Sequence, residues 1–319
     1  MHIPDGFLDA RTATVATGIS LAGVGFALRR ARRGVPPRRV PLMGLTAAFV
    51  FAAQMLNFPV AGGTSGHLMG GVLVAVLLGP SAAAVVMTAV LIVQSLLFAD
   101  GGLLALGANV LNMALAAPLF GYAVYRLVRG ALRGERGRFV AVFFAAWCST
   151  VLAATLCAGE LAWSGVTAWP AVFPAMANVH MVIGLGEGLI TALVIAAVRR
   201  IRPELLEDAA PSGGGQREAI AYGLLLALGL AIFVAPFASP WPDGLERVAE
   251  TLGLEHRAAA SPALASPWAD YRWGGIESAA AATALAGAVG TVLVFALALV
   301  LAHALVPGKE RRRPPLPGA

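Results

Sequence analysis

MHIPDGFL (residues 1–8) opens the chain, and this segment decides how the rest of the sequence is interpreted. Met1 supplies a free α-amine, and His2 adds a backbone nitrogen and the imidazole Nδ1 within a few bonds of it. These three nitrogens can close adjacent chelate rings on one cation; Ni(II) and Cu(II) suit such a planar nitrogen field, and Co(II) is a further candidate. Pro4 fixes its own φ and Asp5-Gly6 is typical of a turn, so we expect a rigid hook with one coordination position open. The alternative is a disordered end in which His2 has no role.

The composition of the chain is that of a membrane protein. Of 319 residues, 58% are hydrophobic and 13% are charged, and the mean hydropathy is +0.78. Such values are typical of proteins that cross a bilayer several times. A formal net charge of +6 is compatible with nucleic-acid binding, but the positions of the arginines indicate membrane topology instead. We expect no cleavable signal peptide, because the first residues carry acidic side chains and lack a basic start.

Eight apolar segments are long enough to cross a bilayer in a bundle of packed helices. They lie at 12–30, 40–56, 80–98, 103–126, 139–162, 177–198, 219–239 and 276–303. A ninth segment, 67–79, is marginal for spanning, and we expect a helix that starts part-way into the membrane. The predicted fold is therefore an all-α polytopic membrane protein, with a seven-helix bundle followed by two further helices.

The basic residues define an orientation. Nineteen of the 23 lie in three connections, 29–39, 126–138 and 199–217, and in the tail from Lys309. With nine crossings, all four regions fall on one side of the membrane, and the positive-inside rule makes that side cytoplasmic. The sequence thus predicts an extracytoplasmic N-terminus and a cytoplasmic C-terminus.

A change of composition divides the chain into two modules. Residues 202–218 are rich in proline and glycine and predict a flexible cytoplasmic linker. Residues 1–201 precede it as the seven-helix module. Residues 219–319 follow it as a two-helix module with an acidic extracytoplasmic loop at 240–274.

A glycine-rich polar loop, 57–67, ends in His67 and lies on the same predicted side as Met1. An imidazole at membrane depth is costly unless it is used, so we interpret His67 as the fourth nitrogen of the metal site. The alternative is a structural histidine that is hydrogen-bonded to a loop carbonyl. The other polar groups that are candidates for supporting the site or lining the ion's entry are Asn57, Thr64, Ser65, Asp100, His180 and Glu187.

Three of these candidates have specific arguments and alternatives. Glu187 is a carboxylate within an apolar helix, which makes it a functional candidate by default. His180 is predicted at the start of the seventh helix, where a structural role is equally compatible. Asp100 lies in an outer turn, where it either attracts cations or caps the following helix. Gln54, Gln94, Asn109 and Asn112 are expected to hydrogen-bond between helices.

Several of these motifs carry a resemblance to a known family. They are residues 1–7, Asn57-Phe58-Pro59 with 62–68, Ala99-Asp100-Gly101-Gly102, and His180 with 184–188. Together they resemble the CbiM/NikM family, the substrate-binding membrane components of energy-coupling-factor cobalt and nickel importers. The resemblance covers roughly residues 1–200 and implies that Met1, His2 and His67 hold the ion through four nitrogens, two of them from His2. Pro242-Asp243-Gly244-Leu245-Glu246 is similar to the small CbiN/NikN subunit, here fused to the first module.

The resemblance implies a function in the plasma (inner) membrane of a prokaryote. The chain is expected to take up Ni(II) or Co(II) together with two ATP-binding subunits, CbiO/NikO-like, and a transmembrane coupling subunit, CbiQ/NikQ-like. It is not expected to hydrolyse ATP, because its single lysine, Lys309, precedes Glu310 and no phosphate-binding G-x-x-x-x-G-K-[ST] loop exists. The second module is expected to assist metal loading by touching the hook.

Two other classes of function remain open from the sequence. One is a metal-sensing or scaffold membrane protein without transport. The other is a membrane-embedded metalloenzyme, which the absence of an H-E-x-x-H motif disfavours. Nickel and cobalt are not distinguished, since the same nitrogens serve both ions.

Overall fold

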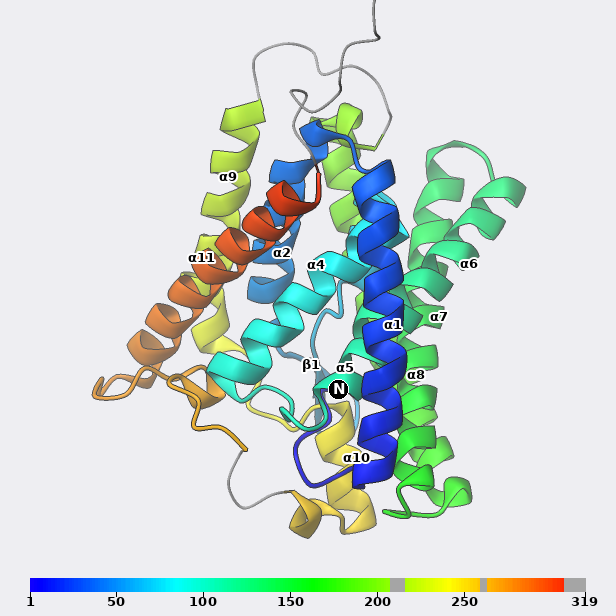
Figure 1. Cartoon of the computed structure of the whole chain (residues 1–319), viewed down its shortest axis with the longest axis vertical. Coiled ribbons are helices and arrows are strands. Elements are labelled where there is room, and N and C mark those ends of the chain that lie inside the picture. The colour runs from blue at the N-terminus through cyan, green and yellow to red at the C-terminus, as the bar shows by residue number, and fades with distance from the viewer. Residues whose placement is uncertain (207–215, 259–262, 307–319) are drawn as a thin grey trace, which may run out of the picture.

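The computed structural model describes residues 1–206, 216–258 and 263–306 (Figure 1). Most of the predicted linker 202–218 and the basic tail from Lys309 lie outside these described residues. The first module comprises α1 (Ala10–Gly34), α2 (Val40–Gln54), α3 (Gly71–Leu78), α4 (Pro80–Val93), α5 (Leu106–Asn109), α6 (Ala117–Ala131), α7 (Gly134–Trp163) and α8 (Trp169–Ile201). The second comprises α9 (Gln216–Gly229), α10 (Gly244–Leu252) and α11 (Ala279–Leu305).

Wider π-helical turns extend three of these helices. They are η2 (Gln94–Phe98) after α4, η3 (Val110–Ala116) between α5 and α6, and η5 (Leu230–Val234) after α9. A short antiparallel hairpin joins α2 to the segment before α3, and its strands are β1 (Phe58–Val60) and β2 (Thr64–Gly66).

Seven helices of the described chain are long and apolar enough to cross a membrane. They are Ala10–Gly34, Pro80–Phe98, Leu106–Ala131, Gly134–Trp163, Trp169–Ile201, Arg217–Phe237 and Ala279–Leu305. The helix α2 has 15 residues and α3 has eight, so both are shorter than a full span. The prediction of an all-α polytopic membrane protein is confirmed.

Two helix boundaries differ from the prediction, and both differences affect the site. The helix expected over 67–79 begins only at Gly71, because Gly70 adopts a left-handed φ of 78° and lies directly against Val50. Residues 67–70 are consequently irregular. The helix expected to start at 177 begins at Trp169. Pro170 lies in its first turn, where a backbone N–H would have no partner within the helix, so proline costs no hydrogen bond there. His180 therefore lies well inside α8.

The helix α4 forms the centre of the bundle. Of the seven candidate spans, its segment is the most buried. The helices α1, α2, α3, α6 and α11 pack around it (Figure 1). The alanine- and valine-rich sequence of α4 suits this position, because small and β-branched side chains allow close approach between helices in a membrane.

The second module packs onto the first through α11. Figure 1 shows α11 lying across α2. A Cβ atom added at Gly290 would lie 2.3 Å from the Phe51 ring, so this glycine allows the two helices to come close. In the loop before α11, the Tyr271 ring stacks on Phe98 and the Trp268 ring contacts Phe98 at an angle, while Phe98 and Tyr271 both contact the Phe51 ring. This packing brings the loop of the second module over the N-terminal hook.

Candidate metal centre

The N-terminal hook is fixed by hydrogen bonds to its backbone. Ile3 is completely buried, and its N–H donates to Asn109 Oδ1 at 2.8 Å. The Ile3 carbonyl accepts from Asn109 Nδ2 at 3.1 Å and from the Gly102 N–H at 2.8 Å. Asn109 was expected only to join helices, but in the structure it holds the segment that carries Met1 and His2.

Asp5 ties the hook to its surroundings. Its Oδ1 accepts from the Leu104 N–H at 2.8 Å, and its Oδ2 accepts from the Ala263 N–H of the second module at 3.2 Å. A Cβ atom added at Gly102 would lie 2.1 Å from Asp5 Oδ1, so only glycine fits beside this carboxylate. The turn predicted from Asp5-Gly6 is present, with Gly6 at a φ of 93°.

The loop that carries His67 is anchored to both modules. Ser65 in β2 donates its N–H to the Pro242 carbonyl at 2.8 Å and its hydroxyl to the Trp241 carbonyl at 2.7 Å. On the other side, Glu187 of α8 accepts the N–H groups of Met69 at 2.6 Å and Gly70 at 3.0 Å. Glu187 thus positions the backbone next to His67, and Ser65 joins the loop to the second module.

The amine of Met1 and the imidazole of His67 lie side by side. Met1 N lies 3.1 Å from His67 Nε2, while His67 Nδ1 lies 3.2 Å from the Leu68 carbonyl. The N–H on Nδ1 can donate to that carbonyl, which leaves a lone pair on Nε2 facing the amine. Two neighbouring nitrogen ligands at bond lengths of roughly 2 Å are about 3 Å apart on a cation. The spacing of these two nitrogens therefore suits adjacent positions on one ion.

His2 completes the group of nitrogen donors. Its ring stacks on that of His67, with centroids 5.3 Å apart and planes inclined by 20°. Its Nδ1 lies 3.0 Å from Asp100 Oδ1, and its Nε2 is buried with no hydrogen-bond partner among the described residues. The Nδ1 expected in the chelate thus faces Asp100.

Asp243 of the second module joins the same group, and sequence reasoning did not single it out. Its side chain caps α10 by accepting from the N–H groups of Leu245 and Glu246. Its Oδ2 accepts a hydrogen bond from the Met1 amine and lies 4.0 Å from His67 Nε2. The sequence feature that pointed to Asp243 was its place in the Pro242–Glu246 motif, which lies on the same predicted side of the membrane as Met1.

A second contact from the same module reaches His2 indirectly. The Tyr271 hydroxyl donates to Asp100 Oδ2 at 2.5 Å, and Asp100 in turn pairs with His2. Gln94 donates from Nε2 to Gln54 Oε1 at 2.7 Å and lies 3.2 Å from the Tyr271 oxygen. The contact expected between the outer loop and the hook is therefore present, through Asp243 and through Tyr271.

The electrostatics of the group set its protonation. Burial disfavours the charged Met1 amine, but the carboxylate of Asp243 outweighs it, so the pKa of this amine is raised above 8.0. Burial and the neighbouring Met1 charge lower the pKa of His67 to about 3. Burial opposes ionisation of Asp243, yet the Met1 charge holds the pKa of that carboxyl well below its usual range. At neutral pH the group is an ammonium–carboxylate pair beside a neutral His67.

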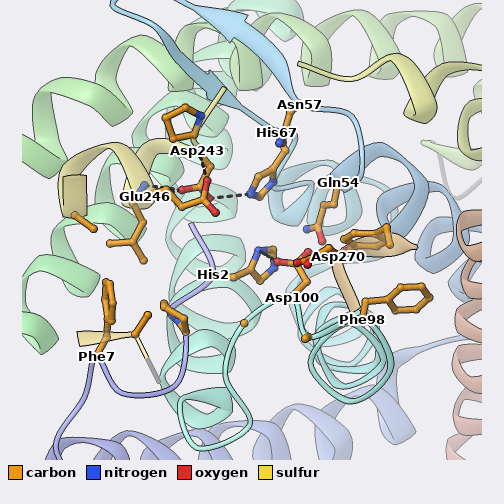
Figure 2. Close-up of a pocket in the computed structure, with 18 of the residues that line it drawn as sticks. His2, Phe7, Gln54, Asn57, His67, Phe98, Asp100, Asp243, Glu246 and Asp270 are labelled. Atoms are coloured by element: carbon orange, nitrogen blue, oxygen red, sulfur yellow. Dashed lines mark hydrogen bonds and ion pairs between the residues drawn. The ribbon is translucent and has the colours of Figure 1, made fainter. Parts of the chain in front are cut away.

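An acidic cavity of about 600 Å³ leads to these residues (Figure 2). His2 and His67 line this cavity, and Asp100 and Asp243 lie beside them in Figure 2. The carboxylates that line the cavity are Asp100, Asp243, Glu246, Glu250, Glu255 and Asp270. Clustered negative charge of this kind attracts a divalent cation and raises its local concentration.

The remaining predicted residues lie around the group without touching the nitrogens. Asn57 lines the acidic cavity. Thr64 is buried in β2, opposite Val60. His180 is buried, bonds the Met176 carbonyl at 2.8 Å, and lines a water-sized hollow behind Met1 and His67. His180 thus shares a small hollow with Met1, His67 and Asp243 but does not line the acidic cavity.

Metal affinity is expected to rise with pH. The Met1 amine must lose its proton to bind a cation, and its raised pKa keeps it protonated at neutral pH. The apparent affinity for Ni(II) should therefore increase by at least about tenfold per pH unit between roughly pH 6 and 8. His67 contributes no proton in this range, because it is already neutral. Competition titrations at several pH values would measure the slope, and an affinity independent of pH would contradict it.

Comparisons with known proteins agree along the whole chain. Residues 2–205 match the family CbiM, described as a cobalt uptake substrate-specific transmembrane region, and residues 217–306 match the PDGLE domain. The chain is 39% identical over 304 residues to a candidate fused nickel transport protein, NikMN, of Archaeoglobus fulgidus, covering 94% of this chain and 98% of that protein. It is 33% identical over 288 residues to the fused nickel transport protein NikMN of Rhodobacter capsulatus, covering 84% and 82%.

A solved structure is also similar to about two thirds of the chain. It is the crystal structure of a transition metal transporter, with 33% sequence identity and a TM-score of 0.59. The match covers 67% of this chain and all of that one.

Proposed function

This chain belongs to the CbiM family, with a PDGLE domain fused to it, and we propose that it captures Ni(II) or Co(II) with high affinity as the substrate-binding component of an energy-coupling-factor importer. It is a cobalt/nickel transport component and not an enzyme. Met1, His2 and His67 are the proposed ligands of the transported ion.

One observation carries the proposal of a nitrogen site. Met1 N and His67 Nε2, which are 66 residues apart in sequence, lie 3.1 Å apart, at the spacing of adjacent ligands. Ni(II) and Co(II) are borderline ions that bind amine and imidazole nitrogens well. The backbone nitrogen and imidazole of His2 are the other proposed donors, and they are adjacent to the amine through covalent bonds.

The arrangement of charge supports entry from outside the cell. Figure 1 places the α1–α2 connection, the α6–α7 connection and the end of α8 at one end of the bundle, opposite Met1 and α10. Together with the adjoining helix ends, these segments (29–39, 126–138 and 199–202) contain most of the arginines of the described chain. By the positive-inside rule they face the cytoplasm of a prokaryotic cell, so the acidic cavity opens to the exterior of its plasma membrane.

Active uptake would depend on partner subunits. We propose two CbiO/NikO-like ATP-binding subunits and a CbiQ/NikQ-like transmembrane coupling subunit, since this chain has no phosphate-binding loop of its own. The test is accumulation of radioactive nickel or cobalt in cells that express the chain with and without these subunits. Accumulation only with the ATP-binding subunits supports the proposal. Accumulation without them would indicate a passive channel, and binding without accumulation would indicate a sensor or scaffold.

We further propose that the second module prepares the site for the ion. Asp243 holds the Met1 amine and Tyr271 holds Asp100 against His2, so this module contacts the surroundings of both N-terminal ligands. Deleting residues 219–319 should therefore reduce transport. Unchanged transport by the truncated chain would remove this part of the proposal.

Asp243→Asn is expected to slow metal loading more than it changes affinity. Asparagine preserves the helix cap but removes a negative charge from the entry. The Asp243 carboxylate stabilises both the protonated Met1 amine before binding and the metal ion after binding, so its effect on the equilibrium affinity largely cancels. Its attraction for the incoming ion does not cancel and is lost in the variant. We expect the association rate to fall several-fold in stopped-flow measurements at low salt. Glu250→Gln is the control, because Glu250 lines the same cavity but pairs with Arg247 at 3.1 Å and not with a proposed ligand; equal slowing by both variants would contradict a specific role.

A further inference from the structure

Two buried oxygen atoms at the contact between η3 and α7 have no hydrogen-bond donor. Asn112 of η3 donates from Nδ2 to Glu160 Oε2 of α7 at 2.7 Å. The remaining oxygens of the two groups, Glu160 Oε1 and Asn112 Oδ1, are both buried, and neither has a hydrogen-bond partner among the described residues. We call these two side chains the Glu160–Asn112 pair. The metal centre described above makes no use of it.

The Glu160–Asn112 pair lacks one proton when Glu160 is ionised. A carboxylate only accepts hydrogen bonds, and so does the oxygen of an amide, so Oε1 and Oδ1 are then two buried acceptors without a donor. Buried polar groups without a partner cost free energy and are rare in folded proteins. A proton on Glu160 Oε1 corrects both defects, because the O–H donates to Asn112 Oδ1 while Asn112 Nδ2 donates to Oε2. The two planar groups then form a closed ring of two hydrogen bonds.

The surroundings of Glu160 offer no cation to a carboxylate. Among the described residues no arginine, lysine or histidine forms an ion pair with it, and the guanidinium of Arg11 lies instead over the Trp163 ring, 5.3 Å from its centre. A buried charge is costly unless it is paired or receives several hydrogen bonds. Glu187 provides a contrast, because both of its oxygens accept backbone N–H groups.

The Glu160–Asn112 pair lies next to the anchor of the N-terminal hook. Asn112 follows Asn109 by three residues, and Asn109 bonds both the N–H and the carbonyl of Ile3. These two asparagines belong to a short α5 and the wide turns of η3. Ser20 of α1 ties this segment down on one side by donating to the Gly107 carbonyl at 2.6 Å, and the Glu160–Asn112 pair ties it to α7. The position of the hook therefore depends on both attachments.

We propose that Glu160 is a neutral carboxylic acid that positions the metal-binding hook through Asn112 and Asn109. Its proton lies on Oε1 and is donated to Asn112 Oδ1. Glu160 touches neither the ion nor its proposed ligands, so it is a positioning residue. Its effect on metal binding rests on the proposed function, whereas its protonation and its effect on the hook do not.

Infrared spectroscopy of the full chain in detergent, without metal and at neutral pH, tests the proton. A protonated carboxyl absorbs at a higher frequency than a carboxylate, and its band shifts in deuterated water. We expect such a band in the native chain and its loss in Glu160→Gln. Glu187→Gln is the matched control and should keep the Glu160 band. Absence of the band from the native chain would mean that Glu160 is ionised and that a water or a cation serves its oxygens, which would overturn the proposal.

The reactivity of the Met1 amine tests the positioning without metal. This amine is buried in the hook, and the side chain of Lys309 is the only other primary amine of the chain, so acylation of the N-terminal peptide can be followed cleanly by mass spectrometry. Glu160→Met keeps the length of the side chain but neither hydrogen bond, and acylation should accelerate by roughly tenfold or more. Glu160→Gln can form the same ring of two hydrogen bonds and should react at the native rate. Equal acceleration in both variants, or none in Glu160→Met, would overturn the proposal.

Competition titration with Ni(II) separates this proposal from the proposed function. Glu160→Met should weaken Ni(II) binding by roughly tenfold, the lower end of the effect of residues that support a metal site, and Glu160→Gln should bind as the native chain does. Native affinity in a folded Glu160→Met chain would overturn the positioning role, and thermal unfolding shows whether that variant is folded. Failure of the native chain to bind Ni(II) would defeat the proposed function instead, and the infrared and acylation results would still decide the role of Glu160.

Discussion

One residue added before Met1 is expected to abolish high-affinity metal binding. The addition turns the amine at position 1 into an amide, which is a far poorer metal ligand, and moves the new amine away from His67 Nε2, now 3.1 Å from it. It also removes the ammonium partner of the buried Asp243. Loss of a direct ligand should cost more than the roughly 10–100-fold typical of supporting residues around a metal.

The measurement is competition titration of Ni(II) and Co(II) into the purified chain. The same residue added after Ala319 is the control and should leave the affinity unchanged. Thermal unfolding without metal shows whether the extended chain is folded, and a lower melting temperature is expected because Asp243 loses its partner. Normal affinity in a folded, extended chain would exclude the Met1 amine as a ligand.

His67→Ala should weaken metal binding by a comparable amount, because it removes a different ligand of the ion. The variant keeps the amine and both His2 nitrogens but lacks the fourth donor, so a planar four-nitrogen site cannot form. The hairpin and the Glu187 contacts use backbone groups, and we expect them to survive. Bound Ni(II) in the native chain should show the d–d absorption of a planar nitrogen complex, and this band should be lost in the variant.

His256→Ala is a matched control for this experiment. It removes an exposed imidazole from the outer loop, outside the lining of the acidic cavity. We expect native affinity and the native spectrum from it. Retention of the planar band in His67→Ala would show that another group supplies the fourth ligand.

Much of the site could be expected from the sequence because its donors are local or carry a distinctive pattern. Met1 and His2 are neighbours, so their chelate depends only on covalent geometry. His67 ends a polar, glycine-rich loop between apolar segments, a pattern that indicates use of the imidazole. Asp100 and Glu187 stood out as charges next to or within apolar helices, and both lie near the proposed ligands, Asp100 against His2 and Glu187 against the backbone beyond His67.

Other residues could not be assigned because their roles depend on contacts between distant segments. Asp243 and Met1 are separated by 242 positions, and they meet because α10 packs on α8 and Ser65 holds the carbonyls of Trp241 and Pro242. The role of Asn109 follows from the path of the hook beneath it. His180 was expected at the start of its helix because the apolar pattern did not reveal that α8 starts at Trp169.

The sequence by itself determined that the chain is a polytopic helical membrane protein, because hydropathy and helix length respond to the bilayer and not to neighbouring segments. It also determined which nitrogens are available at the N-terminus. The tertiary structure alone decided that the Met1 amine meets His67, that a carboxylate of the second module pairs with it, and which ring atom of His2 faces Asp100. These are distances between side chains far apart in the chain, and they are set by close packing of several helices, which no local pattern encodes.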